Sequence, residues 1–153
     1  MRLIARRIRG LAIVDNHTRE SLTLVPNQRM RSMNVVEALE SVTRKKGFPD
    51  RIKVDNGPEF TSKDLDRWAY WNKVALDFSR PGTPSDNAFI EAFNSRFRQE
   101  CLNEHWFLTL QDAQEKIEAW RLEYNSERPH SALGYQTPNE FISRIERQTM
   151  PAA

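Results

Sequence analysis

Asp55 and Glu91 are the residues whose types and surroundings best suit chemistry in this sequence. Asp55 follows the short alternating run Arg51–Val54 and precedes Asn56 and Gly57. A carboxylate at a strand end of an α/β protein lies where active sites gather. Asn-Gly is also a strong turn dipeptide. Taken alone, this segment favours a plain turn and leaves chemistry as the alternative.

Glu91 lies in residues 86–104, a segment whose pattern predicts an amphipathic helix. At about 100° per residue, polar side chains share the face of Glu91 and an aromatic stripe lies on the other side. The polar set is Asn87, Asn94, Ser95 and Arg98, and the stripe is Phe89, Phe93 and Phe97. A polar face of this kind is usually only solvated. The Pro- and Gly-containing loop before it, however, suits a segment that moves over a substrate.

The remaining chain predicts the elements that would position these two carboxylates. Alternating apolar residues indicate a hairpin, and helical spacing bounded by caps indicates helices. The predicted strands are 11–14, 22–25, 51–54 and 74–79, and the predicted helices are 34–46, 62–73, 86–104, 110–126 and a short one from Pro138. This order indicates an α/β sandwich with an antiparallel hairpin and parallel additions.

Composition bounds the class of protein. The chain has 153 residues, 39% apolar and 29% charged, without an apolar run near the roughly 18 residues of a membrane span. We therefore expect one domain, cytoplasmic and without membrane contact, since the N-terminus also has no signal-peptide pattern. Residues 1–53 hold 12 basic against 5 acidic side chains, and residues 54–153 hold 11 against 16. The basic part suits a polyanion partner, although a solvated surface explains it as well.

Cysteine and histidine chemistry has little support in this sequence. Cys101 is the single cysteine, and the three histidines, at positions 17, 105 and 130, are far apart. The spacing matches no structural zinc site. We interpret Cys101 as a small buried residue rather than a nucleophile.

Three segments resemble one family. The segments "DNGPEFTSKDL", "PGTPSDNAFIEAFNSRFRQECLNE" and "WRLEYNSERPHSALGYQTPNEF" are similar to the catalytic core of bacterial insertion-sequence transposases of the OrfB type, which have a retroviral-integrase-like core with three acidic catalytic residues. The resemblance runs from about Gly10 to Phe141. The 35 residues between Asp55 and Glu91 match the family's spacing between its second and third acids.

The resemblance implies a ribonuclease-H-like α/β fold, with a mixed sheet flanked by helices and a helical C-terminal part. It implies a single core domain over residues 1–153, with a lead-in at 1–9, the core at 10–142 and a tail at 143–153. The implied activity is phosphodiester hydrolysis and strand transfer on DNA, at transposon ends and target. Asp55 and Glu91 are the implied catalytic ligands of two Mg²⁺ or Mn²⁺ ions, since such ions take hard oxygen ligands.

The resemblance also implies DNA contacts and protein partners. Asn87 and Arg98 match positions that contact DNA near the cut, and Asn56 shapes the turn next to Asp55. Lys63 and Arg96 are further candidates for phosphate contacts, although each is equally explained as a surface charge. Self-association, or association with a full-length transposase, is implied as well.

The sequence departs from the family at its first catalytic Asp. Only 14 residues precede Asp15, and none of them is Asp or Glu. Asp15 itself corresponds to the end of the family's second strand. We therefore expect an N-terminally truncated core with an incomplete site, weakened metal binding and an open sheet edge that could pair with another chain. The alternatives are a non-catalytic remnant that binds DNA or full-length transposase, and a stand-alone nuclease.

Overall fold

A β-hairpin at the start of the chain supplies side chains to both cores of the protein. The computed structural model describes residues 9–27, 30–55, 57–80 and 88–150. Strand β1 (Arg9–Val14) pairs antiparallel with β2 (Ser21–Asn27), which confirms the predicted hairpin. Successive side chains of a strand point to opposite faces. Leu11 accordingly belongs to one buried cluster, and Ala12 packs against the other.

The middle of the chain forms a helix–strand–helix–strand unit. Its elements are α1 (Ser32–Lys46), β3 (Arg51–Val54), α2 (Lys63–Trp71) and β4 (Ala75–Phe78), all close to the predicted bounds. Gly47 ends α1 in a backbone conformation with φ 82°, which favours glycine. Ser62 begins α2 by accepting a hydrogen bond from the Leu65 amide. Strand β3 then pairs parallel with β4, so this unit brings Asp55 to the end of β3.

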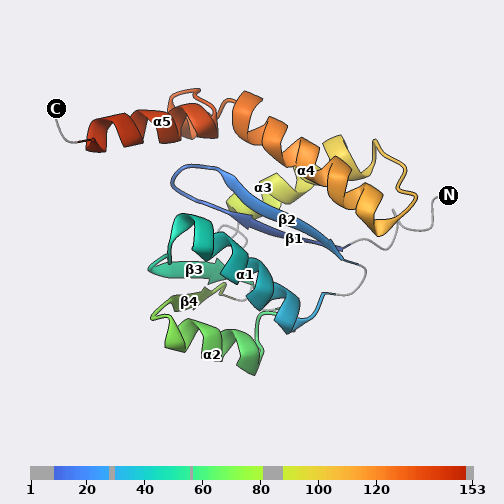
Figure 1. The fold of residues 1–153 in the computed structure, drawn as a ribbon, viewed down its shortest axis with the longest axis vertical. Coiled ribbons are helices and arrows are strands. Elements are labelled where there is room, and N and C mark those ends of the chain that lie inside the picture. Colours follow the sequence, from blue (N-terminus) through green and yellow to red (C-terminus); the bar gives the residue numbers. More distant parts are fainter. Residues whose placement is uncertain (1–8, 28–29, 56, 81–87, 151–153) are drawn as a thin grey trace.

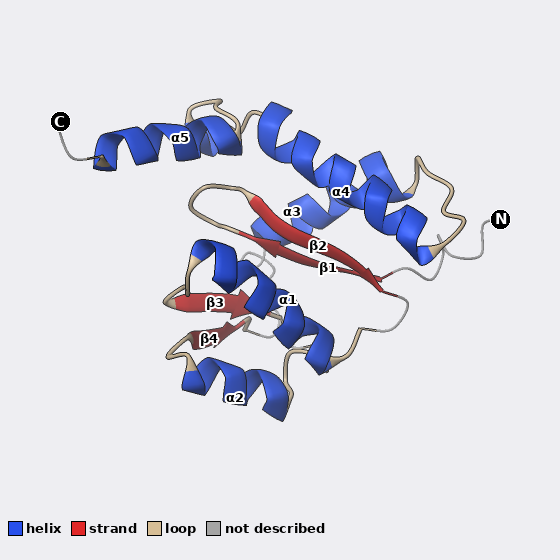
Figure 2. Cartoon of the chain, in the orientation of Figure 1, coloured by secondary structure: helices blue, strands red, loops and turns tan. Residues whose placement is uncertain are grey.

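The two strand pairs do not hydrogen-bond to each other. Within the described residues, β1 and β2 make one two-stranded sheet, and β3 and β4 make another. The antiparallel and parallel pairings expected of a mixed sheet are both present, with a gap between them (Figure 1). The arrowheads in Figure 2 show that β3 runs in the opposite direction to β1. The two strands that lie beside the gap are β1 and β3, so they form the inner edges of the two sheets (Figure 1).

The C-terminal part is helical, as predicted. Its elements are α3 (Ala88–Phe97), the π-helical turn η2 (Arg98–Leu102), α4 (Leu110–Glu127), the 3₁₀ turn η3 (Ser131–Leu133) and α5 (Pro138–Thr149). The predicted single α-helix to Glu104 is wrong, because regular α-helix ends at Phe97. Phe93, Phe97 and Cys101 recur every four residues, slightly more than one α-helical turn. The wider π turn keeps Cys101 on the buried face.

Helix α4 is fixed against the hairpin by one buried side chain. The Asn125 side chain accepts a hydrogen bond from the Ser21 amide at 2.8 Å and donates one to the Ser21 carbonyl at 3.0 Å. Arg121 donates to the same carbonyl at 2.7 Å. These bonds join residues a hundred positions apart and determine how α4 lies along β2.

Two apolar clusters lie on the two faces of the hairpin. The first joins Leu24 to α3, η2 and α4 through Phe93, Phe97, Cys101, Phe107, Ala113, Ile117 and Tyr124. The second joins Leu11 to α1 and α2 through Val35, Val36, Ala38, Leu39, Leu65, Trp68, Ala69 and Val74. We call them the α3/α4 core and the α1/α2 core. Burial in these clusters is the dominant favourable contribution to folding.

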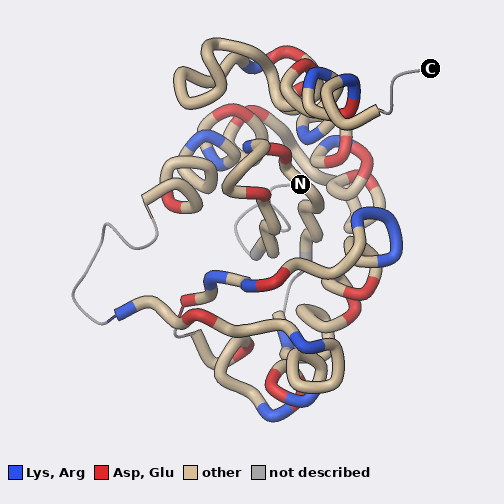
Figure 3. The backbone as a smooth tube through the Cα atoms, turned by 90° about the vertical axis from the view of Figure 1, so that its left-hand side faces the viewer, with Lys and Arg blue, Asp and Glu red and all other residues tan. Residues whose placement is uncertain are grey.

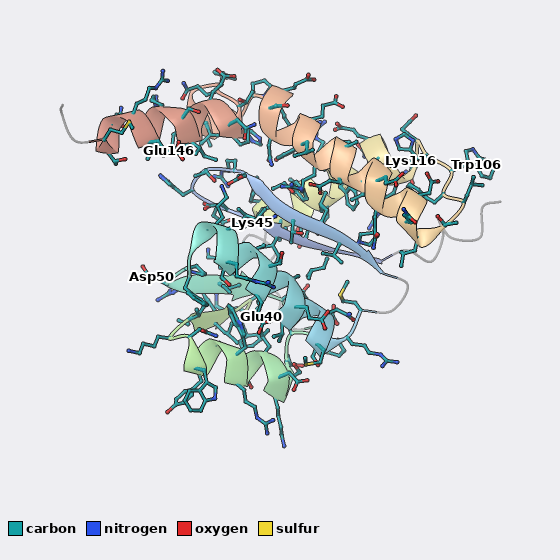
Figure 4. The ribbon with its side chains drawn as sticks, in the orientation of Figure 1. Glu40, Lys45, Asp50, Trp106, Lys116 and Glu146 are labelled. Atoms are coloured by element: carbon teal, nitrogen blue, oxygen red, sulfur yellow. The ribbon has the colours of Figure 1, made fainter. Side chains whose placement is uncertain are left out.

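The polar surface carries charges of both signs. Figure 3 shows Lys and Arg interspersed with Asp and Glu along the described backbone. At the start of α4, Lys116 donates hydrogen bonds to the Trp106 carbonyl at 2.8 Å and to Asp112 at 3.1 Å, which holds the preceding loop (Figure 4). In the described part of the chain, none of the helices combines the length and apolar character needed to cross a bilayer.

Candidate active site

Asp55 lies at the end of β3 with its carboxylate held by the turn that follows. The Gly57 amide donates a hydrogen bond to Oδ1 of Asp55 at 2.8 Å. A Cβ atom on Gly57 would stand 3.0 Å from the same oxygen, closer than ordinary van der Waals contact between non-bonded atoms. The two interpretations of this segment, a plain turn and a site of chemistry, are therefore compatible, because the turn orients an exposed carboxylate. The neighbouring candidate Asn56 lies outside the described residues.

Glu91 lies in the first turn of α3 on its solvent-facing side. Phe93 and Phe97 on the opposite side are buried, 2% and 5% exposed. Glu91, Asn94, Ser95 and Arg98 are exposed, so the described part of the segment has the two faces that its sequence predicts. The α3/α4 core thus fixes the rotation of α3 and directs Glu91 outward. Asn87 lies outside the described residues.

The two carboxylates line one cavity. It has a volume of about 1350 Å³, and Asp55, Glu91, Asn94 and Arg98 are all among its lining residues. Of the described basic residues that the sequence analysis proposed as phosphate contacts, Arg98, at the junction of α3 and η2, lines this cavity. The exposed Lys63 and Arg96 are not among its lining residues.

Asp15 has a structural partnership of its own. Its Oδ1 accepts hydrogen bonds from the amides of His17 at 2.7 Å and Thr18 at 3.1 Å, which closes the turn of the hairpin. Because β1 and β3 run in opposite directions (Figure 2), the residue after β1 lies at the other end of the strands from Asp55. No three His, Cys, Asp or Glu side chains of the described ranges converge on a potential metal site.

Glu59 is a neighbouring acid that the sequence did not single out. A Cβ atom added to Gly57 would lie 3.1 Å from the carboxyl carbon of Glu59 and 3.0 Å from Oδ1 of Asp55. Glu59 lines the same cavity. Two carboxyl groups therefore flank Gly57. Two residues four positions apart are expected to be neighbours only in a helix. This segment is a turn, so the spacing of Asp55 and Glu59 did not predict their proximity.

Cys101 is buried and chemically quiet, which agrees with its interpretation as a packing residue. Its side chain is fully buried in the α3/α4 core. Burial raises the pKa of the Cys101 thiol to about 11. The thiolate needed for nucleophilic attack is therefore scarce at neutral pH.

Comparison with known proteins identifies the family. Two models described as Integrase core domain match residues 2–84 and 72–138. An uncharacterized 31.7 kDa protein of insertion element IS407 from Burkholderia multivorans is 48% identical over 91% of this chain and 50% of that protein. The transposase for insertion sequence element IS904 from Lactococcus lactis is 31% identical over 59% of this chain and 36% of that protein.

A solved structure gives the fold. The catalytic core domain of BIV integrase has a TM-score of 0.69 and 11% identity, over 94% of this chain and 96% of that domain. This likeness confirms the predicted ribonuclease-H-like fold. The chain spans half the length of the IS407 protein that it matches. On the match of the family models, the chain belongs to the integrase core domain family.

Proposed function

We propose that this chain is a catalytic core for DNA transposition, in which Asp55 and Glu91 bind divalent metal and act on phosphodiester bonds. The observation that carries the proposal is that both carboxylates line one cavity. They reach it from two elements that pack in different cores, β3 in the α1/α2 core and α3 in the α3/α4 core. The transposase name of the IS904 relative supports the same activity. Both residues offer the hard oxygen atoms that Mg²⁺ and Mn²⁺ take as ligands.

In this proposal each residue has a separate task. Gly57 keeps the Asp55 carboxylate oriented at the end of β3, and the buried face of α3 keeps Glu91 directed to the cavity. Two divalent ions, when bound, activate an attacking oxygen and stabilise a leaving one. Arg98 holds a DNA phosphate by paired hydrogen bonds near the carboxylates. Asn56, Lys63, Asn87 and Arg96 remain proposed DNA contacts.

Metal binding tests the carboxylates without depending on cleavage. Mn²⁺ affinity is measured by water-proton relaxation for the unaltered chain, Asp55→Asn and Glu91→Gln. Asp66→Asn and Glu115→Gln are matched controls, because both residues are exposed and neither lines the cavity. We expect each site substitution to weaken Mn²⁺ binding and each control to leave it unchanged. Equal affinity in all five proteins would overturn the assignment.

Cleavage tests the reaction. The unaltered chain and the same variants are incubated with labelled insertion-sequence end DNA and Mn²⁺. We expect weak cleavage that both site substitutions abolish, because Asp15 caps its own turn away from Asp55. Cleavage that survives Asp55→Asn and Glu91→Gln would refute the proposed roles.

DNA binding has its own test at Arg98. Neutralised phosphates release counterions, so the logarithm of affinity falls linearly with the logarithm of salt concentration. We expect Arg98→Gln to weaken binding similarly on all sequences and to reduce that slope by about one. Arg147→Gln, in the last turn of α5, serves as a matched control with an unchanged slope.

A second candidate function is binding without catalysis, to DNA or to a full-length transposase. It is favoured by the turn-capping role of Asp15, which lines the same cavity but holds its carboxylate in its own turn, so that Asp55 and Glu91 are the two proposed ligands there. DNA binding that persists with no Mn²⁺ affinity and no cleavage would support it. Self-association, also proposed, is measured by sedimentation with and without DNA.

A further inference from the structure

The cavity that Asp55 and Glu91 share is lined by basic side chains as well as acidic ones. Its basic lining residues in the described part of the chain are Arg19, Lys46, Arg51, Lys53 and Arg98. A DNA strand would bring a series of negatively charged phosphates into this cavity, and lysine and arginine are the side chains that bind phosphates most often. The partner that each cation already has in the folded chain therefore indicates which of them are available to DNA.

Two of the cavity cations are held in ion pairs. The ammonium of Lys46 lies 3.1 Å from a carboxylate oxygen of Glu20. The guanidinium of Arg51 lies 3.8 Å from a carboxylate oxygen of Asp77. A phosphate would have to compete with these carboxylates for either cation.

The other cavity cations differ in their surroundings. The guanidinium of Arg19 lies over the ring of Phe89, 4.4 Å from its centroid. Within the described ranges, the side chains of Lys53 and Arg98 have no ion pair, hydrogen bond or cation–π contact. Both are exposed. Lys53 and Arg98 are therefore the cavity cations that a phosphate can bind without displacing a protein group.

Lys53 lies on the same face of β3 as Asp55. Arg51, Lys53 and Asp55 are exposed, whereas Ile52 packs on the α1/α2 core and Val54 is buried. Successive residues of a strand point to opposite faces and advance about 3.3 Å each. The Cα atoms of Lys53 and Asp55 are thus about 6.6 Å apart along the strand. Their side chains extend to the same side.

The pairing of β3 with β4 explains why Lys53 has no acidic partner there. Lys53 is opposite Asp77 in the parallel register. The carboxylate of Asp77, however, pairs with Arg51. Arg51 thus neutralises the acid that stands opposite Lys53, and the ammonium of Lys53 is left to the cavity.

Each of the two elements that carry a proposed metal ligand also carries one of these cations. Lys53 precedes Asp55 by two residues on β3, and Arg98 follows Glu91 by seven residues at the end of α3. At 1.5 Å per helical residue, Arg98 lies roughly 10 Å along the axis from Glu91. Because β3 packs in the α1/α2 core and α3 in the α3/α4 core, the two cations reach the cavity from different layers of the protein.

We propose that Lys53 is a DNA-binding residue of this site, whose ammonium holds a backbone phosphate beside Asp55 while Arg98 holds another beside Glu91. This inference rests on the proposed binding of DNA at the cavity. Lysine acts on a phosphate as a compact point charge. The contact therefore positions the DNA strand and does not select its base sequence.

The salt dependence of DNA binding tests the contact. The complete chain and its variants are titrated with a fluorescent duplex that carries an insertion-sequence end, at several salt concentrations. We expect Lys53→Gln to reduce the slope of log affinity against log salt by about one, and Lys53→Arg to keep the slope. Lys46→Gln is the matched control, because Lys46 lines the same cavity but is paired with Glu20. Its slope should stay unchanged.

Chemical modification of the unaltered chain locates the contact directly. Lysines are acylated with acetic anhydride, with and without the duplex, and the modified sites are identified by peptide mass spectrometry. At a free DNA concentration ten times its Kd, about one molecule in eleven is unbound, so acylation of Lys53 should slow about tenfold. Lys45, which is exposed and does not line the cavity, should react at an unchanged rate.

The outcomes separate this inference from the proposed function. An unchanged slope in Lys53→Gln and an unprotected Lys53, together with a reduced slope in Arg98→Gln, would overturn the Lys53 contact and leave DNA binding at the cavity standing. An equal reduction by Lys46→Gln would also overturn it, because the effect would then be one of general charge. An unaltered chain that binds no duplex at any salt concentration would overturn both proposals.

Discussion

Replacing Asn125 by alanine tests how the helical C-terminal part is held on the hairpin. Asn125 is 4% exposed, and its side chain makes both hydrogen bonds to the backbone of the fully buried Ser21. In Asn125→Ala the Ser21 carbonyl keeps Arg121 as a donor. The Ser21 amide is left without this acceptor in a buried place.

The magnitude follows from these two losses. A buried donor left unsatisfied costs about 1–3 kcal/mol, and the lost bond to the carbonyl costs about 1 kcal/mol more. The higher helix propensity of alanine offsets roughly 0.5 kcal/mol. We expect the free energy of unfolding to fall by about 1.5–3.5 kcal/mol, which lowers Tm by about 3–14 °C for a chain of this size.

The assay is urea denaturation followed by circular dichroism, with thermal melts in parallel. Gln114→Ala is the matched control, because Gln114 is an exposed amide on the same helix. Its effect should stay within about 0.5 kcal/mol. A change for Asn125→Ala no larger than that of Gln114→Ala would refute the proposed anchor.

Three further predictions concern the site, pH and thiol chemistry. Gly57→Ala should displace the Asp55 carboxylate and weaken Mn²⁺ binding about tenfold, as for groups that orient a metal ligand; an unchanged Mn²⁺ titration would contradict this. Burial, with the charges of Arg128 and Arg19, lowers the pKa of His130 from its ordinary 6.5. The unfolded state thus binds this proton more readily, so the free energy of unfolding should fall as pH decreases from about 6.5 toward the folded-state pKa; urea titrations across pH should show that slope, and His130→Gln should remove it. Alkylation of Cys101 at pH 8 should be about 100-fold slower in the folded than in the unfolded chain, from its pKa of about 11 against an ordinary 9.0; equal iodoacetamide rates would contradict the burial.

Local pattern was sufficient to predict most elements of this fold. The strand Arg51–Val54 has the predicted bounds, and the helices predicted to begin near residues 62 and 110 do begin there, after the caps Ser62 and Thr109. Such signals involve neighbours within one turn of helix, so the sequence displays them directly. The π turn after Phe97 was missed because its cause, the burial of Cys101 beside α4, joins distant segments.

The candidate site was partly predictable for the same reason. The opposite faces of Phe93 and Glu91 follow from helical periodicity. The pairing of Asp55 with Glu91 came from family resemblance, because no local rule links residues this far apart. Glu59 beside Gly57 was missed, since its position depends on the path of a turn rather than on a repeating pattern.

The relative position of the two proposed ligands depends on the hairpin. Asp55 follows β3, whose Ile52 packs on the α1/α2 core, whereas Glu91 lies on α3, which is anchored in the α3/α4 core. Strand β1 contributes side chains to both, and a Cβ on Gly10 would stand 3.2 Å from the Phe97 ring. Because the hairpin contributes to both cores, its packing determines where Glu91 lies relative to Asp55.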